Sequence, residues 1–288
     1  MKKALISILA ALSLAPVHPI AGPTAPAPAA AVRIMPLGDS ITGSPGCWRA
    51  LLWDRMRAAG RTDIDFVGTL PPQGCAVAHD GDNEGHGGAL VTDVADRNQL
   101  PGWLAATRPD VVLMHFGTND VWNDRPPSTI LAAYGRLVDQ MRASNPNMRI
   151  LVAQLIPMSP AGCAPCGQRV VALNAAIPSW AAGKSTPASP VTVVDQWTGF
   201  STSADTYDGV HPNAAGDRKM ADRWFPALAA ALGDAPPPTP TPPPTPTPTV
   251  PSGGCTATYR TVGSWQNGHQ GEVTVRNTGT AALTRPPG

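Results

Sequence analysis

One short stretch of the sequence places an acid and a base three positions apart. In YDGVHPN, residues 207–213, Asp208 precedes His211, and Pro212 follows the histidine directly. The residue before a proline is disfavoured in the helical region, so this stretch is expected to be a loop. A carboxylate that bonds an imidazole fixes its tautomer and stabilises its protonated form. The pair therefore predicts a base that removes a proton from some third group.

The elements that position this pair are predicted from alternating apolar strands and helical patterns. The expected strands are 32–37, 64–69, 109–117, 148–156 and 190–196, and the expected helices are 47–59, 129–144, 170–180 and 214–232. Nearly continuous apolar strands separated by amphipathic helices indicate an α/β fold, with a parallel sheet that helices cover on both faces. In such folds the functional site lies at the carboxyl ends of the strands.

Two more polar residues follow the expected strands. Ser40 follows the first strand in GDSIT, just before a helix, and Asn119 follows the third strand in GTND. A serine hydroxyl needs a neighbouring base to act as a nucleophile at neutral pH. Acyl transfer also needs donors for the developing oxyanion, which the Ser40 N–H and the Asn119 amide can supply. We therefore predict acyl transfer, with Ser40 as nucleophile, His211 as its base and Asp208 as the orienting acid.

A third oxyanion donor is expected from a glycine, because a residue without Cβ lets a substrate approach its N–H closely. The segment EGHGGALVTDV supplies Gly85, Gly87 and Gly88. Chemistry alone does not choose between these three glycines.

The remaining histidines of this region are predicted to have other roles. His115 lies within an apolar strand and is expected to be a core residue or to support a neighbour. His79 and His86 flank the acidic segment DGDNEG and are expected at the surface. That segment, which contains Asp80 to Glu84, resembles the first half of a calcium loop, but Val91 stands where the bidentate acid belongs. We predict a polar turn and no metal.

Four ordered blocks resemble those of the SGNH, or GDSL-type, hydrolases. They are GDSIT, the glycine of EGHGGA, GTND and DGVHP, and they extend from Gly38 to Pro212. The stretches MPLGDSITGSPGCWRALLW, NEGHGG and MHFGTNDVW are further similar to carbohydrate esterase family three, the acetyl xylan esterases. Ile41 stands where the superfamily name implies leucine, and family three also tolerates this change.

The resemblance implies a role for each matching residue. The nucleophile falls on Ser40, the acid and base on Asp208 and His211, and the oxyanion hole on Ser40, Gly88 and Asn119. It implies a three-layer α/β/α sandwich, flavodoxin-like, with a five-stranded parallel sheet and without a metal or other cofactor. The implied activity is removal of O-acetyl groups from plant polysaccharide, above all acetylated xylan, through an acyl-enzyme.

Two alternatives stay open. One is a broad SGNH carboxylesterase or lysophospholipase, which needs an exposed apolar acyl groove, and Val121 and Trp122 are the candidates for it. The other is a non-catalytic polysaccharide-binding protein on a stalk, against which the intact set of serine, histidine and aspartate argues.

The first residues and the cysteines indicate export. Residues 1–31 combine two lysines, an apolar run too short for a membrane span and an Ala/Pro-rich segment, which is typical of a secretory signal. No membrane partner is expected, and the oxidising compartment of a secreted chain favours disulfides. The preferred pairing is Cys47–Cys75 with Cys163–Cys166, and the two other connectivities stay open. With 21 Lys plus Arg against 20 Asp plus Glu, no nucleic-acid partner is expected. A monomer is expected.

A Pro/Thr-rich segment divides the chain. We predict a catalytic domain over 32–233, a semi-rigid linker over 234–254 and an incomplete module over 255–288. The last segment resembles the opening of a family-two cellulose-binding module, with Trp265 matching one surface aromatic. Two strands are expected, at 256–262 and 271–275. With Cys255 lacking a partner, we expect that this segment neither folds alone nor holds cellulose beyond a weak contact through Trp265, unless Cys255 bridges two chains.

Overall fold

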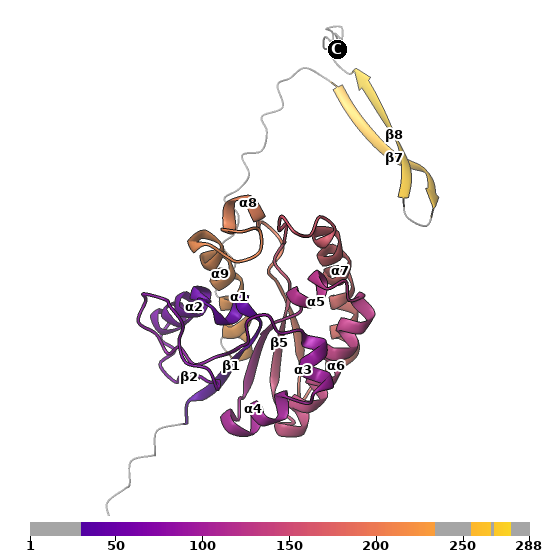
Figure 1. Cartoon of the computed structure of the whole chain (residues 1–288). Helices are drawn as coiled ribbons and strands as arrows, with labels where there is room; N and C mark the ends of the chain where they lie inside the picture. Colours follow the sequence, from indigo (N-terminus) through magenta and orange to yellow (C-terminus); the bar gives the residue numbers. More distant parts are fainter. Residues whose placement is uncertain (1–29, 234–254, 266–267, 278–288) are drawn as a thin grey trace, which may run out of the picture. The chain divides into compact units, whose positions relative to one another are not determined.

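The computed structural model describes residues 30–233, 255–265 and 268–277 (Figure 1). The expected secretory signal (apart from its last two residues) and the expected linker lie outside the described residues. The chain divides into two units, Met1–Pro236 and Pro237–Gly288, and each is described by itself.

The first unit is built on a parallel sheet. Its main strands are β1 (Val32–Gly38), β2 (Ile64–Phe66), β4 (Val111–His115), β5 (Arg149–Gln154) and β6 (Val191–Asp195), in the spatial order β2-β1-β4-β5-β6. This confirms the predicted parallel sheet. A short strand that was not predicted, β3 (Glu84–Gly85), also pairs with the end of β1. Two residues carry no periodicity, so nothing in the sequence pattern indicated β3.

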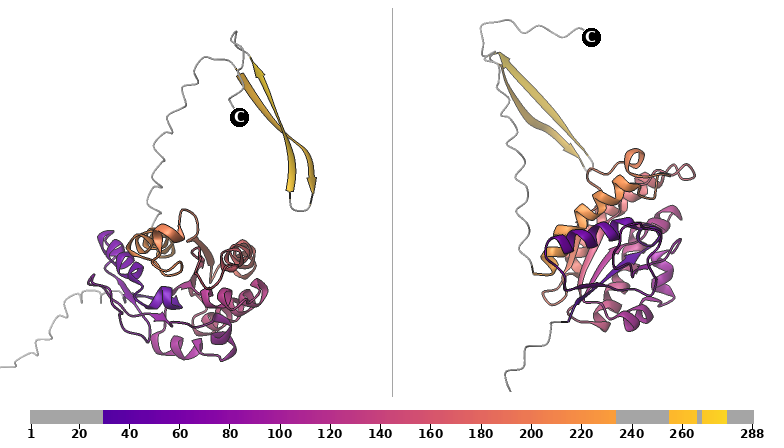
Figure 2. Two further views of the ribbon diagram at one scale, coloured as in Figure 1. Left: turned by 45° about the horizontal axis from the view of Figure 1, so that its top comes forward. Right: turned by 90° about the vertical axis from the view of Figure 1, so that its left-hand side faces the viewer.

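Helices cover both faces of this sheet (Figures 1 and 2). On one face, α2 (Cys47–Ala58) packs against α9 (Ala214–Ala231). On the other face, α6 (Pro127–Ser144) contacts α7 (Cys166–Lys184), and α3 (Val91–Asp96) and α4 (Leu100–Thr107) lie against α6. The result is the predicted three-layer sandwich. Among the described residues, no helix combines the length and the apolar character that crossing a membrane requires.

Three very short helices follow the carboxyl ends of strands. They are α1 (Ser40–Gly43) after β1, α5 (Thr118–Trp122) after β4 and α8 (Thr202–Asp205) after β6. Each has only four or five residues, so none shows a helical period in the sequence.

The strand order creates a switch point between β1 and β4. From β1 the chain moves to β2 on one side and later to β4 on the other. Every residue of β4 is buried, as expected for a central strand. The crevice at the carboxyl ends of two such strands is the preferred ligand site of open α/β sheets. Ser40 and Asn119 follow β1 and β4, so the topology brings both to this crevice.

Two disulfides tie loops to helices. Cys47 pairs with Cys75 and Cys163 with Cys166, which confirms the preferred connectivity. Cys47 begins α2 and Cys166 begins α7, so each bridge fastens a loop to the first turn of a helix.

The described residues of the second unit form a β-hairpin. β7 (Cys255–Trp265) pairs antiparallel with β8 (Gly268–Asn277), with a register shift between Thr261 and Gly263. Both predicted strands are present and each is longer than expected. An isolated two-stranded hairpin is marginally stable in water.

Candidate active site

The structure brings the predicted serine, histidine and aspartate together. Ser40 Oγ lies 2.9 Å from His211 Nε2. On the other side of the ring, His211 Nδ1 lies 2.6 Å from Asp208 Oδ2. This is the order of contacts in which a base can take a proton from a hydroxyl while a carboxylate stabilises the imidazolium that forms.

A tight turn delivers the acid and the base to each other. Asp208 Oδ1 accepts hydrogen bonds from the backbone N–H groups of Val210 (2.9 Å) and His211 (2.7 Å). One carboxylate therefore shapes the turn with one oxygen and binds the imidazole with the other. Burial raises the pKa of Asp208, but the hydrogen bonds that it accepts outweigh burial and hold this pKa below its ordinary value. Asp208 thus stays ionised beside the ring.

The buried carboxylate of Asp39 holds the turn that bears Ser40 in place. It caps α1 by accepting the N–H of Ile41 at 3.1 Å, and its second oxygen accepts the N–H of Thr118 at 3.3 Å. Asp39 thereby joins the turn that bears Ser40 to the turn that bears Asn119. Burial raises the pKa of Asp39 to about 6. Gly38 is required at this turn, since a Cβ there would lie 2.2 Å from the carbonyl oxygen of His115.

The far end of α1 is fastened by the first turn of α2. The indole Nε1–H of Trp48 donates to the carbonyl oxygen of Ile41 at 2.9 Å, and Arg49 Nε–H donates to that of Thr42 at 2.7 Å. Arg49 is fully buried, and burial lowers its pKa to about 10. Sequence analysis missed this arginine, because a charged residue in an amphipathic helix is normally expected to face the solvent.

Asn119 is joined to the glycine segment. Its Nδ2 donates one hydrogen to the carbonyl oxygen of Ala89 at 3.0 Å. The neighbouring Asp120 is buried and caps α3, because its carboxylate accepts the N–H groups of Val91 (2.7 Å) and Thr92 (3.1 Å). The GTND turn therefore holds the glycine segment from two directions. Nothing in the sequence pattern indicated the cap that Asp120 supplies.

The structure separates the three candidate oxyanion glycines. Gly85 packs against α1, where an added Cβ would lie 2.3 Å from the backbone nitrogen of Gly43, so Gly85 serves close packing. Gly87 lies beside Ser40, since an added Cβ would be 4.0 Å from the Ser40 Cβ. Gly88, the position that the resemblance selects, has a φ of +76°, which favours glycine. Gly87 and Gly88 therefore remain the candidates for the third donor, and of these two Gly87 is placed beside Ser40.

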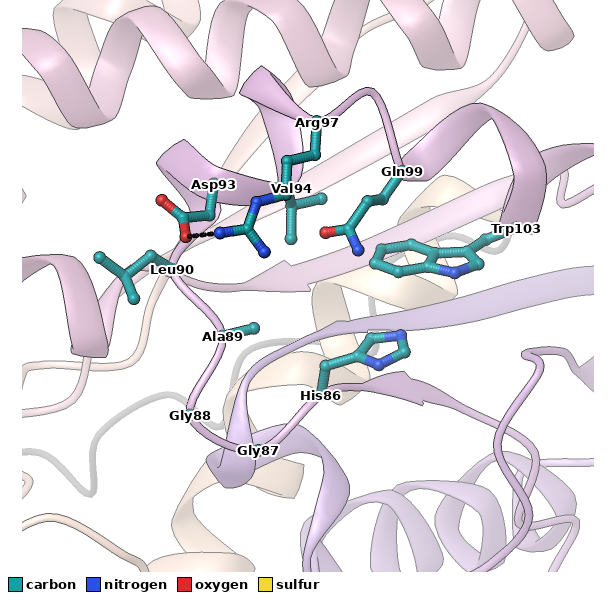
Figure 3. Close-up of a pocket in the computed structure, with 10 residues that line it drawn as sticks. All are labelled: His86, Gly87, Gly88, Ala89, Leu90, Asp93, Val94, Arg97, Gln99 and Trp103. Atoms are coloured by element: carbon teal, nitrogen blue, oxygen red, sulfur yellow. Dashed lines mark hydrogen bonds and ion pairs between the residues drawn. The ribbon is translucent and has the colours of Figure 1, made fainter.

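His86 is partly exposed, with 27% of its side chain accessible, but two neighbours also hold it in place. Its ring stacks on Trp103 with centroids 4.2 Å apart (Figure 3). Its Nε2 lies 2.6 Å from an oxygen of the buried Glu84. Its backbone N–H also donates to the carbonyl oxygen of Gly38 at 2.9 Å. His86 therefore anchors the start of the glycine segment to the end of β1. His79 is also partly exposed, and its Nδ1 lies 2.7 Å from the carbonyl oxygen of Val77.

The acidic segment before β3 is only partly a polar turn. Asp80 accepts the N–H of Phe66 at 2.8 Å, whereas Glu84 is buried in β3 and accepts the N–H and the hydroxyl of Thr69, both at 2.8 Å. These two carboxylates therefore bond different partners, Phe66 for Asp80 and Thr69 and His86 for Glu84. In the parts of the chain that the structure describes, no group of three or more His, Cys, Asp or Glu side chains is placed to hold a metal ion.

His115 is a core residue, as predicted. It is fully buried, and its Nε2 accepts the backbone N–H of Ile156 at 3.2 Å. Burial lowers the pKa of His115 to about 4, so the ring is neutral near neutral pH. It joins the ends of β4 and β5 and lies outside the Ser40–His211–Asp208 chain of contacts.

A three-layer sandwich with these residues at its switch point defines an SGNH-type hydrolase of carboxylic esters. Residues 37–219 match the GDSL-like Lipase/Acylhydrolase family, and the chain belongs to that family.

Several solved structures are similar to this chain. An acetyl esterase variant with an acetate ion is 36% identical, with a TM-score of 0.65 over 70% of this chain and 98% of that one. A carbohydrate esterase family 3 protein from Talaromyces cellulolyticus is also 36% identical, with a TM-score of 0.65 over 71% of this chain and 99% of that one. A family 3 carbohydrate esterase from Clostridium thermocellum is 28% identical, with a TM-score of 0.60 over 70% of this chain and 98% of that one.

One curated relative is a multidomain esterase from Ruminococcus flavefaciens. It is 28% identical over an alignment of 247 residues, and the match covers 78% of this chain. The match spans only 31% of the length of that relative.

Proposed function

We propose that this chain is a secreted serine esterase that removes O-acetyl groups from plant polysaccharide, with acetylated xylan as the first substrate to test. The observation that carries the proposal is the continuous contact from Ser40 Oγ through His211 to Asp208 at the carboxyl edge of the sheet. The high coverage of the similar acetyl esterase and family 3 carbohydrate esterases supports the acetyl group and the carbohydrate.

In the proposed acylation step, Ser40 Oγ attacks the carbonyl carbon of the acetyl ester while His211 Nε2 takes the hydroxyl proton. The carbonyl oxygen becomes an oxyanion, which accepts hydrogen bonds from the backbone N–H groups of Ser40 and Gly88 and from Asn119 Nδ2. Asn119 Nδ2 donates one of its two hydrogens to the carbonyl oxygen of Ala89, so the second hydrogen is available for the oxyanion.

Collapse of this intermediate breaks the bond between the acetyl carbon and the sugar oxygen. His211 returns its proton to that oxygen, and the sugar hydroxyl leaves. A water then attacks the acetyl-Ser40 ester with His211 as base again, which releases acetate and restores the serine. Asp208 stabilises the imidazolium in both halves of the reaction.

The alternative of a long-chain carboxylesterase receives less support. Of the two residues offered for an apolar acyl groove, Val121 is buried with 1% exposure, and only Trp122, at 40%, reaches the surface. One exposed indole does not make a groove for an acyl chain.

The deciding experiment measures acetate release from acetylated xylan beside hydrolysis of long-chain acyl esters, with Ser40→Ala as the blank. A clear preference for the acetylated polysaccharide is expected. A preference for long chains would instead identify a lipase-like esterase.

Secretion is part of the proposal and has its own test. Both disulfides suit an oxidising compartment, where such bonds persist. The expected outcome is activity in the culture medium, with an N-terminus between Ala21 and Ala31 when the released protein is sequenced. Retention of the whole activity inside cells, with an intact N-terminus, would refute it.

A further inference from the structure

A hollow of about 290 Å³ lies directly beside the glycine segment of the site (Figure 3). Gly87 and Gly88 form one rim, and side chains from α3, from α4 and from the turn between them form the opposite wall. We infer that this hollow is a saccharide subsite, which binds the sugar ring next to the ring that carries the acetyl group. The inference rests on the proposed function and names the part of the chain that recognises the carbohydrate.

The polar wall of the hollow suits an uncharged ligand with many hydroxyl groups. Asp93 and Arg97 form an ion pair across one helical turn, with Arg97 Nη2 3.0 Å from Asp93 Oδ2. Because the two charges balance, the wall attracts neither anions nor cations strongly, yet it offers both donors and acceptors. The exposed amide of Gln99 adds one more acceptor and two donors.

The apolar part of the hollow suits the CH face of a sugar ring. Trp103 borders the hollow, and one face of its indole is covered by the His86 ring at a centroid distance of 4.2 Å and an interplanar angle of 15°. His86 is in turn held by the buried Glu84. The indole is therefore a rigid surface, and rigid amphipathic aromatics bind ligands at a low cost in conformational entropy.

The size and position of the hollow favour the alcohol side of the ester. Its volume of about 290 Å³ lies just below the range for ligand sites, which runs from about 300 to 1,000 Å³, so it fits a single ring better than an extended chain. The rim residue Gly87 lies beside Ser40. When the acetyl group of one sugar ring lies at Ser40, the neighbouring ring of the same substrate can therefore lie in the hollow.

The test compares two esters that share the acetyl group. One is an acetylated xylo-oligosaccharide, and the other is 4-nitrophenyl acetate, which has no second ring. For Gln99→Ala, the ratio of kcat/KM for the oligosaccharide to that for the aryl ester should fall roughly tenfold, chiefly through a higher KM for the oligosaccharide, as loss of hydrogen bonds to substrate predicts. Gln140→Ala is the matched control, because Gln140 bonds Asn98 outside the hollow; its ratio should match the wild type.

Two further variants make the result decisive. Trp103→Phe keeps an aromatic ring against His86 and should lower the same ratio, whereas an equal loss on both esters would assign Trp103 a purely structural role and count against the subsite.

If Trp122→Ala lowers the ratio and Gln99→Ala does not, the polysaccharide lies over α5 and the inference is wrong. A wild type that cleaves the aryl ester but no acetylated oligosaccharide would refute the proposed function. Binding of unmodified xylo-oligosaccharide to Ser40→Ala, unchanged by Gln99→Ala, would overturn the subsite alone.

Discussion

The hydroxyl of Ser40 and the imidazole Nε2 of His211 lie 2.9 Å apart, although 171 positions separate the two residues in the chain. Ser40 is placed by the end of β1 and the cap from Asp39, whereas His211 is placed by the local turn at Asp208. Both residues lie at the carboxyl edge because the strands are parallel, but β4 and β5 separate β1 from β6. The packing of α9 against α2, with the N–H of Trp48 bonded to Asp217, brings the loop after β6 back to the end of β1.

Removal of either partner should abolish ester hydrolysis. Ser40→Ala and His211→Ala are each expected to lower kcat by roughly 10⁴ to 10⁶, and the double variant should lose little more, because residues that act as a unit are not additive. Asp208→Ala should be milder, since the serine and its base remain. Initial rates on 4-nitrophenyl acetate, with thermal unfolding as the control for folding, check this prediction. A single variant with near wild-type rates and normal unfolding would remove that residue from the mechanism.

Asn119→Ala should lower kcat by roughly 10² to 10³ with little change in KM, as loss of an oxyanion donor predicts. Asn123→Ala is the matched control. Asn123 is exposed at the end of the same short helix and donates only to the Asn119 carbonyl oxygen. The control should stay close to wild type. If Asn119→Ala acts mainly on KM, the amide positions the substrate instead.

His115 should make the protein less stable in acid. Because burial lowers its folded-state pKa to about 4 from an ordinary value of 6.5, the folded state binds fewer protons than the unfolded state between these values. The contribution of neutral, buried His115 to the unfolding free energy is complete above the ordinary pKa and is lost as the pH falls towards the folded-state pKa. Between pH 7.5 and pH 5, wild type should lose about 2 kcal/mol of unfolding free energy relative to His115→Gln.

Urea unfolding of both proteins at the two pH values measures this difference. The glutamine can still accept the N–H of Ile156, and contributions from Asp39 and Asp217, whose pKa values burial raises to about 6, cancel in the comparison. Equal pH dependence in the two proteins would show that the His115 ring is charged or solvated in the folded state.

The two disulfides should stabilise the fold unequally and leave the chemistry alone. Cys47–Cys75 spans a sequence separation of 28 and Cys163–Cys166 one of 3. Constraint of the unfolded chain predicts losses of about 3 to 4 kcal/mol and about 2 kcal/mol when each pair is changed to serine. Urea midpoints and residual activity below the transition test this. Inactivation by a thiol reductant before any unfolding would place a cysteine in the active site.

The hairpin beyond residue 254 should add little to cellulose binding. The two strands that the structure describes there bury too little apolar surface to hold a rigid binding face. A pull-down on crystalline cellulose should retain the whole chain and a chain ended at Gly233 equally poorly. Clear retention of the longer chain alone would show that the segment is a working module, and retention lost on reduction would point to a bridge through Cys255.

The local chemistry of the site could be predicted from the sequence, because it depends on neighbours along the chain. Asp208 and His211 meet within one turn that the aspartate itself stabilises, and Pro212 keeps this turn out of a helix. The strands could also be predicted from local sequence, because a strand that is buried on both faces is a continuous run of apolar residues. These patterns predicted the parallel sheet, and they placed Ser40 and Asn119 at the ends of its strands.

Only the tertiary structure decided which residues support that chemistry. Arg49 donates to the carbonyl oxygen of Gly81, Asp120 accepts the N–H of Val91, and the N–H of His86 donates to Gly38. These contacts join segments that lie far apart in the chain, and a contact of this kind leaves no period or spacing in the sequence. The same holds for the glycines, where three equivalent-looking residues take different roles. Gly85 differs from Gly87 only because the backbone of Gly43 packs against it, and that packing exists only once β1 and β3 lie side by side.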